Sequence, residues 1–210
     1  MIKVEINGKK YEFPNGWDDI TMKQYCRLFH DIDTSDSEAS DVERSIGVIK
    51  NEAKIISRLL GEDDDFVIKL PIEVFSMLQN EARFIYSIDG FINSGIHYLT
   101  IDGMRYWIPE PKDMSLRQYI DADMIMKDDK EDTFIELLSC LLLPMGKDGK
   151  YVYDGNYQEL IPKIEKMKAS NGLPFIYSFF KKKELSKKLS EVCSKVEEVA
   201  SQLPHSTQGL

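Results

Sequence analysis

The sequence predicts a mostly helical α+β protein, built by tandem duplication of a unit that combines a β-hairpin with helices. Two observations support this prediction: a stretch near the start recurs in the middle of the chain, and each copy contains a hairpin turn signal. A third, heptad spacing near the end, predicts an amphipathic C-terminal helix. The expected organisation is a first repeat over 1–92, a second repeat over 93–180, a heptad helix over 181–204 and a tail over 205–210.

The repeat is clearest between residues 6–25 and residues 101–119, aligned with one gap near Asp18. Conservative matches lie between the identities, and agreement of this kind over about twenty residues is improbable by chance. The identical pairs are Ile6/Ile101, Gly8/Gly103, Tyr11/Tyr106, Pro14/Pro109, Asp19/Asp113, Gln24/Gln118 and Tyr25/Tyr119.

Each copy begins with a predicted β-hairpin. Apolar and polar residues alternate on both sides of Asn7-Gly8 in the first copy and of Asp102-Gly103 in the second. These dipeptides favour the positive φ angles of a type I′ turn. Pro14 and Pro109 then end the second strand, because proline cannot donate a hydrogen bond to a sheet.

A capped helix follows each hairpin. Thr21 with Gln24, and Ser115 with Gln118, have the spacing of a capping box, in which the hydroxyl and the glutamine satisfy each other's backbone donors. The tyrosine after each glutamine has the position of a hydrophobic staple, with Ile20 as its partner in the first copy and Met114 in the second. The recurring glutamine and tyrosine therefore have a structural explanation, which we favour over a role in a binding site.

The correspondence continues into the later helices. Residues 55–61 (IISRLLG) match residues 137–143 (LLSCLLL) as the apolar ends of two helices. Leu70-Pro71 and Leu173-Pro174 each open a further helix, to about residues 86 and 183, because proline suits the first helical turn. The second copy also inserts residues 145–172, within which 158–167 predict a short helix.

The end of the chain carries an apolar seam with the 4-3 spacing of a coiled coil, about two and a half heptads long. Such a helix is marginal alone and needs a partner for its stripe, either the body of the same chain or another chain. The basic residues 181–183 at its start are interpreted as an ordinary solvated face, balanced by nearby glutamates. The seam residues, our main candidates for partner binding, are Leu185, Leu189, Val192, Val196, Val199 and Leu203.

Composition narrows the classes of partner. The net charge of −9 disfavours general nucleic-acid binding, because attraction to phosphates needs a basic surface. No apolar run approaches the length that spans a bilayer, so no membrane partner is expected. The alternating start of the chain does not resemble a signal peptide, and the three separated cysteines fit a reducing cytosol.

The sequence offers no catalytic, cofactor-binding or metal-ligating set. His30, His97 and His205 are isolated, and no glycine-rich phosphate loop or nucleophile elbow occurs. The acidic residues 62–65 lack the alternating spacing of a calcium loop. We therefore expect a non-enzymatic protein without cofactors.

Two tryptophans complete the candidate partner-binding residues. Trp17 and Trp107 lie at the exits of the two predicted hairpins. Aromatic residues often anchor partner proteins. They also hold a hairpin against the helices beneath it, and that structural interpretation is the commoner one.

Several segments together resemble a known family. GWDDITMKQYCRL, PEPKDMSLRQYIDAD and the Leu173–Phe180 stretch are similar to segments of small virion-assembly proteins of tailed bacteriophages, including tail-assembly-chaperone-like proteins of crAss-like phages of Bacteroidetes. The resemblance implies a phage structural or assembly protein: a tail-assembly chaperone, a connector component or packaged cargo. It implies portal, tail or capsid proteins, or the chain itself, as partners, and the host bacterial cytoplasm or the virion as its location. No catalytic residue is carried over.

Two other hypotheses remain open. The chain could be a phage accessory enzyme or a nucleotide-handling protein with a pocket between the repeats, where clefts tend to form. It could instead be a nucleic-acid-binding cargo protein, which would need the lysines of the last helix to form one patch.

Overall fold

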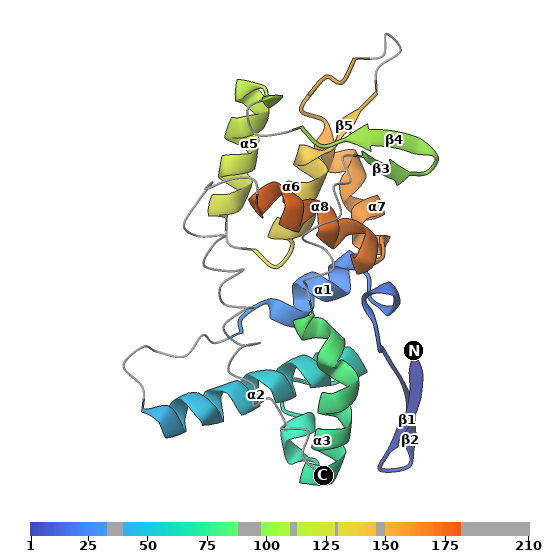
Figure 1. Cartoon of the computed structure of the whole chain (residues 1–210), viewed down its shortest axis with the longest axis vertical. Coiled ribbons are helices and arrows are strands. Elements are labelled where there is room, and N and C mark those ends of the chain that lie inside the picture. Colours follow the sequence, from blue (N-terminus) through green and yellow to red (C-terminus); the bar gives the residue numbers. More distant parts are fainter. Residues whose placement is uncertain (33–39, 88–97, 110–112, 129, 146–149, 182–210) are drawn as a thin grey trace. The chain divides into compact units, whose positions relative to one another are not determined.

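The computed structural model describes the chain except for residues 33–39, 88–97, 110–112, 129, 146–149 and 182–210 (Figure 1). The predicted C-terminal seam lies outside the described residues. The described part is mostly helical with two small antiparallel sheets, which confirms the predicted α+β class. No helix in this part is long and apolar enough to cross a membrane. The chain divides into two compact units, which are described separately below.

Unit 1 contains Met1–Asn15 and Asp31–Ser87. Its core lies between the hairpin and the helices, and includes Phe13, Ile55, Ile56, Leu78 and Ile85, all fully buried. Its elements are β1 (Ile2–Ile6), β2 (Lys9–Phe13), α2 (Asp41–Leu60), the 3-10 helix η2 (Val67–Lys69), α3 (Ile72–Glu81) and the 3-10 helix η3 (Ala82–Tyr86).

Unit 2 contains Gly16–His30 and the described part of Ile88–Lys183. The apolar helix α6 lies at its centre and contacts α5, α7, α8 and α1. Its elements are η1 (Trp17–Asp19), α1 (Met22–Phe29), β3 (Tyr98–Ile101), β4 (Met104–Trp107), α5 (Leu116–Lys127), α6 (Thr133–Leu141), β5 (Leu143–Pro144), η5 (Tyr157–Leu160), α7 (Ile161–Lys166) and α8 (Ala169–Lys181).

The two predicted hairpins have the same local structure. In each, the two turn residues have positive φ, at 52° and 79° for Asn7 and Gly8 and at 50° and 77° for Asp102 and Gly103. The strands that flank each turn pair antiparallel in the same register, with Ile6 opposite Lys9 and Ile101 opposite Met104. The second hairpin gains β5 as a third strand beside β4. The expected type I′ geometry follows from the Asn-Gly and Asp-Gly dipeptides.

The helix caps agree with the prediction in one copy and differ in part in the other. Thr21 and Gln24 form the full capping box. The Ser115 side chain accepts the backbone N–H of Gln118, but the Gln118 side chain does not return to Ser115. Gln118 Nε2 donates instead to the carbonyl of Cys140, 2.9 Å away at the end of α6. The second capping box was thus wrongly predicted, because a buried helix end competes for the same amide.

A pair of serines supports the repeat inside the later helices. Ser57 in α2 and Ser139 in α6 occupy matched positions in the two apolar segments, and both are fully buried. Each hydroxyl donates to the carbonyl four residues earlier, that of Ala53 or Ile135, at 2.8 Å in both cases. Buried hydroxyls need such a partner, and the two copies satisfy it in the same way.

The compact units do not follow the predicted boundary between residues 92 and 93. Residues 16–30, which belong to the first repeat by sequence, pack in unit 2 with elements of the second repeat. The sequence could not reveal this because α1 is amphipathic, and its apolar stripe fits any suitable apolar surface.

One predicted helix start was also wrong. α8 begins at Ala169, before Leu173-Pro174, and carries Pro174 inside it. By contrast, Pro71 is the N-cap residue of α3, one position before the first helical turn. The predicted helix over 158–167 is present as η5 followed by α7.

Candidate functional site

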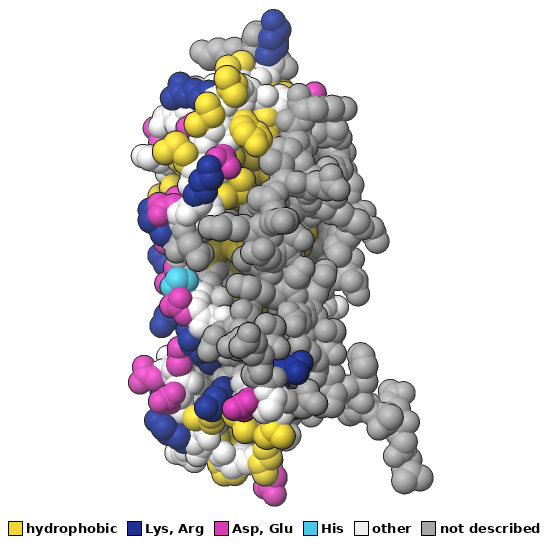
Figure 2. All heavy atoms as spheres, turned by 90° about the vertical axis from the view of Figure 1, so that its left-hand side faces the viewer, with side chains coloured by type: hydrophobic (Ala, Val, Ile, Leu, Met, Phe, Trp, Pro, Cys, Tyr) yellow, Lys and Arg dark blue, Asp and Glu magenta, His cyan; other side chains and the backbone are white. Residues whose placement is uncertain are grey.

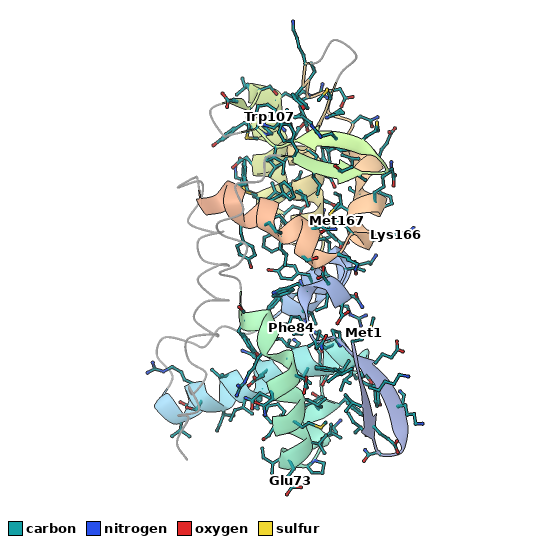
Figure 3. The ribbon with its side chains drawn as sticks, turned by 45° about the vertical axis from the view of Figure 1, so that its right-hand side comes forward. Met1, Glu73, Phe84, Trp107, Lys166 and Met167 are labelled. Carbon is teal, nitrogen blue, oxygen red and sulfur yellow. The ribbon has the colours of Figure 1, made fainter. Side chains whose placement is uncertain are left out.

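The packing of α1 in unit 2 defines one face of this helix. The backbone around its N-cap runs beside the segment that precedes α8, with the Met22 N–H donating to the carbonyl of Met167 at 2.8 Å and the Ala169 N–H donating to the carbonyl of Ile20 at 2.7 Å. Met167 is labelled in Figure 3, where α7 ends. Lys23 forms an ion pair with Glu165 at 2.9 Å. The start of α1 is therefore held by backbone and side chain alike.

Side chains complete this contact. Met22 lies against Gly172, where an added Cβ would stand 2.5 Å from the methionine sulfur. The Tyr25 hydroxyl lies 2.9 Å from that of Tyr177, and its ring packs edge-on against Phe134 with centroids 6.2 Å apart. These contacts bury one side of α1 against α6 and α8.

The matching face of α5 is exposed. By the sequence alignment, Met22, Tyr25 and Cys26 of α1 correspond to Leu116, Tyr119 and Ile120 of α5. The α1 residues are 0%, 4% and 4% exposed, whereas the α5 residues are 76%, 41% and 47% exposed. Met124, one turn beyond Ile120, is 65% exposed. We call Leu116, Tyr119, Ile120 and Met124 the α5 face.

The opposite side of α5 explains this difference. Gln118, Ala122 and Ile125 are buried against unit 2, and Gln118 is bound to the end of α6. α5 therefore packs on unit 2 through one side, while the α5 face on the other side is exposed. The ion pair between Asp123 and Lys127 gives the exposed side a polar end. In Figure 2 hydrophobic side chains gather in the upper part of the view, over the region of α5.

The α5 face was not among the residues selected from the sequence, yet a signal was present. Apolar residues at 116, 119, 120 and 124 and a second apolar pair at 122 and 125 cannot all point to one side of a helix. A helical projection would have separated the two sets. The prediction of a capping box hid this signal, because it assigned Gln118 and Tyr119 to local roles.

A second exposed stripe lies on α2. Val42, Ile46 and Ile49 repeat at spacings of four and three along its N-terminal half and are exposed. This half has no counterpart in α6, which begins at the position that matches Asn51. Ser40 and Glu43 form a complete capping box at the N-terminus of α2, which stabilises the first turn of this extension.

The structure separates the two candidate tryptophans. Trp17 is buried and its ring centroid lies 5.7 Å from that of Tyr25, which fits the structural interpretation of this residue. Trp107, labelled in Figure 3, is half-buried on β4 with its ring 5.3 Å from Tyr151. The six seam residues from Leu185 to Leu203 lie outside the described residues.

The described cysteines are not set up for nucleophilic chemistry. Burial raises the pKa of Cys26 to about 12, with Asp132 as a smaller cause. Burial also raises the pKa of the Cys140 thiol to about 11. Because the thiolate is the reactive form, both side chains behave as packed apolar groups at neutral pH. Cys140 also lies 3.5 Å from the Tyr153 hydroxyl, which donates to Asp121 at 2.6 Å.

Acidic residues 62–65 serve partly as ion-pair partners. Glu62 accepts hydrogen bonds from Lys9 and Tyr11 of the hairpin, which lower its pKa. Asp64 receives a two-pronged contact from Arg58, with Nε and Nη2 at 2.7 and 2.9 Å from its oxygens, and this contact lowers its pKa. Among the described residues, no group of three His, Cys, Asp or Glu side chains could hold a metal ion.

Comparisons of the chain with protein-family models, with curated proteins and with solved structures found no match.

Proposed function

We propose that this chain is a non-enzymatic bacteriophage assembly protein that acts through protein–protein contacts, as a tail-assembly chaperone, a connector component or packaged cargo. The α5 face is the observation that supports a contact role. Four large apolar side chains lie together on one exposed helix face, where single scattered apolar residues would need no explanation. The phage setting rests on the resemblance of the repeated segments to virion-assembly proteins.

The contrast between α1 and α5 strengthens this proposal. A helix face with nearly the same sequence pattern is buried in one copy and exposed in the other. Apolar burial contributes about 25 cal/mol per Å², so an exposed face of this kind is a ready source of binding energy. Aromatic and long aliphatic side chains such as Tyr119 and Met124 are typical of interface centres.

Affinity purification from a phage-infected culture, followed by mass spectrometry, tests the proposal. Tagged wild-type protein is expected to recover portal, tail or capsid proteins, and Leu116→Asp is expected to lose them. Val152→Asp is the matched control, because Val152 is an exposed apolar residue of unit 2 outside the α5 face. Equal recovery by all three proteins, or recovery of no virion component, would contradict the proposal.

A further inference from the structure

Two apolar segments of the sequence lie outside the duplicated unit. The N-terminal half of α2, up to Lys50, has no counterpart in α6. The predicted seam from Leu185 to Leu203 follows the second repeat, and no such seam follows the first repeat. Neither segment therefore has an equivalent in the other copy.

Both segments have the same apolar spacing. Successive seam residues are separated by 4, 3, 4, 3 and 4 positions. A series with the same five intervals runs along one side of α2, and its members are Val42, Ile46, Ile49, Ala53, Ile56 and Leu60. Two helices with this spacing can pack along their length, because each places one continuous apolar seam against the other.

Only half of the α2 series is used within unit 1. The second half is buried in the core, whereas the first half is exposed, with Val42 at 69%, Ile46 at 48% and Ile49 at 51%. We call these three residues the α2 stripe. In Figure 1 this half of α2 extends to the left of the other elements of unit 1. The stripe is about 10 Å long, which suits one heptad of a second helix.

The charges beside the two seams favour one direction of packing. Lys50 of α2, and Lys188 and Lys195 of the seam, occupy the e and g positions that flank a coiled-coil contact. In a parallel pair that covers the whole stripe, Lys50 would face one of the other two lysines. In an antiparallel pair, where e faces e, it would face Ser186 or Cys193. Antiparallel packing therefore avoids a contact between like charges.

We propose that the C-terminal seam docks antiparallel on the α2 stripe of its own chain. A contact over one heptad is too short to hold two separate chains together, because short helices are marginal in water. Within one chain the seam stays tethered to unit 1, since the chain crosses between the units at 15–16, at 30–31 and after Ser87. Such tethering raises the effective concentration of the seam. The inference stands apart from the proposed function, because it concerns a contact within one chain.

Trypsin cleavage of the full chain at Lys187, Lys188 and Lys195, followed by mass spectrometry, measures this docking. A docked helix is cut through its transiently open form, so the rate follows the population of that form. Ile46→Glu and Val192→Glu should each be cut about tenfold faster than the wild type, because each weakens the apolar contact. The double variant should be cut no faster than either single variant, because both substitutions remove the same contact.

Matched variants separate docking from general damage. Ile46→Ala removes apolar surface without adding a charge, and should also be cut faster than the wild type. Alanine and glutamate are good helix formers, so circular dichroism should show unchanged helix content for both substitutions of Ile46. Val152→Glu changes an exposed apolar residue of unit 2 and should be cut at the wild-type rate.

Other patterns would overturn the inference. A wild type cut as fast as Val192→Glu would show that the seam is not docked. Protection that Val192→Glu loses and Ile46→Glu keeps would place the seam on another surface or another copy. Protection restored in an equal mixture of these two variants would show docking between chains, since the intact stripe and the intact seam are then on different chains. Slower cleavage of Lys50→Glu would contradict antiparallel packing, because only a parallel pair places a seam lysine opposite this position.

Discussion

Glu52 shows how one position diverged between the two copies. Its carboxylate is buried in unit 1 and accepts hydrogen bonds from Gln79 at 2.9 Å and from Tyr86 at 3.4 Å. Burial raises the pKa of Glu52, and the two hydrogen bonds offset part of that rise. The matching position in unit 2 is Phe134, which packs against Tyr25. A polar contact in one copy therefore occupies the place of an aromatic contact in the other.

The raised pKa of Glu52 makes unit 1 lose stability as pH increases. The folded state binds this proton more tightly than the unfolded state, so the carboxylate imposes no penalty below its ordinary pKa of 4.5. The penalty develops as pH rises from there through the raised pKa of the folded protein. Glu52→Gln should remove this slope and raise stability at neutral pH by about 1 kcal/mol.

Thermal unfolding between pH 4.5 and pH 8 checks this expectation. The substituted amide can accept from Gln79 and donate to the Tyr86 hydroxyl, so both contacts survive. Glu12→Gln, at an exposed position of β2, is the control and should keep the wild-type slope. A lower melting temperature for Glu52→Gln at pH 8 would show that the ionised form stabilises the fold.

The elements that the sequence predicted best are those with local signals. Asn7-Gly8 and Asp102-Gly103 fix the φ angles of their own turns, and Thr21 with Gln24 caps its own helix. Predictions failed where a distant group competed. The Gln118 side chain donates to the carbonyl of Cys140 instead of capping its own helix. α8 begins before Pro174 because the Ala169 N–H donates to the backbone carbonyl of Ile20. The α5 face was missed for a different reason, because the predicted capping box assigned Gln118 and Tyr119 to local roles.

The close contact between α1 and α8 gives a test of that packing. Gly172→Ala places a Cβ 2.5 Å from the sulfur of buried Met22, so α1 must move or Met22 must change rotamer. We expect a loss of about 1–2 kcal/mol in the free energy of unfolding, since overpacking outweighs the gain in helix propensity. Chemical denaturation of the variant measures this change.

Gly47→Ala is the matched control in α2. An added Cβ there meets no atom within 4 Å, so only helix propensity changes and stability should rise by about 0.5–1 kcal/mol. Shortening the neighbour in Met22→Ala should make the effect of Gly172→Ala smaller, because the two residues are in contact. Equal effects of the two glycine substitutions would mean that α1 does not lie tightly on α8.

Unit 2 includes residues 16–30, which are separated in the sequence from the rest of that unit by residues 31–87 of unit 1. A fragment of residues 93–210 lacks Gly16–His30, and so leaves Gly172, Phe134 and Tyr177 without the helix that contacts them. We expect this fragment to lose cooperative thermal unfolding. Joining residues 16–30 ahead of it through a flexible Gly/Ser linker should restore a sharp transition, because a linker supplies a high local concentration of α1.

Near-ultraviolet circular dichroism during heating distinguishes these outcomes, since Trp17 and Tyr25 report directly on the docked segment. Cooperative unfolding of 93–210 alone, at the temperature of the full chain, would mean that the second repeat is self-sufficient. The predicted boundary at residue 92 would then describe a real domain.

Because α1 packs in unit 2, its position in the sequence also constrains the order in which the two units can fold during synthesis. Synthesis proceeds at about 5–20 residues per second, so about 8–30 s separate the completion of α1 at Phe29 from that of α8 at Lys181. Unit 1 can close during that interval with residues 16–30 looped out. The nascent chain must keep the apolar side of Met22 and Tyr25 out of premature contacts until translation has delivered its docking surface.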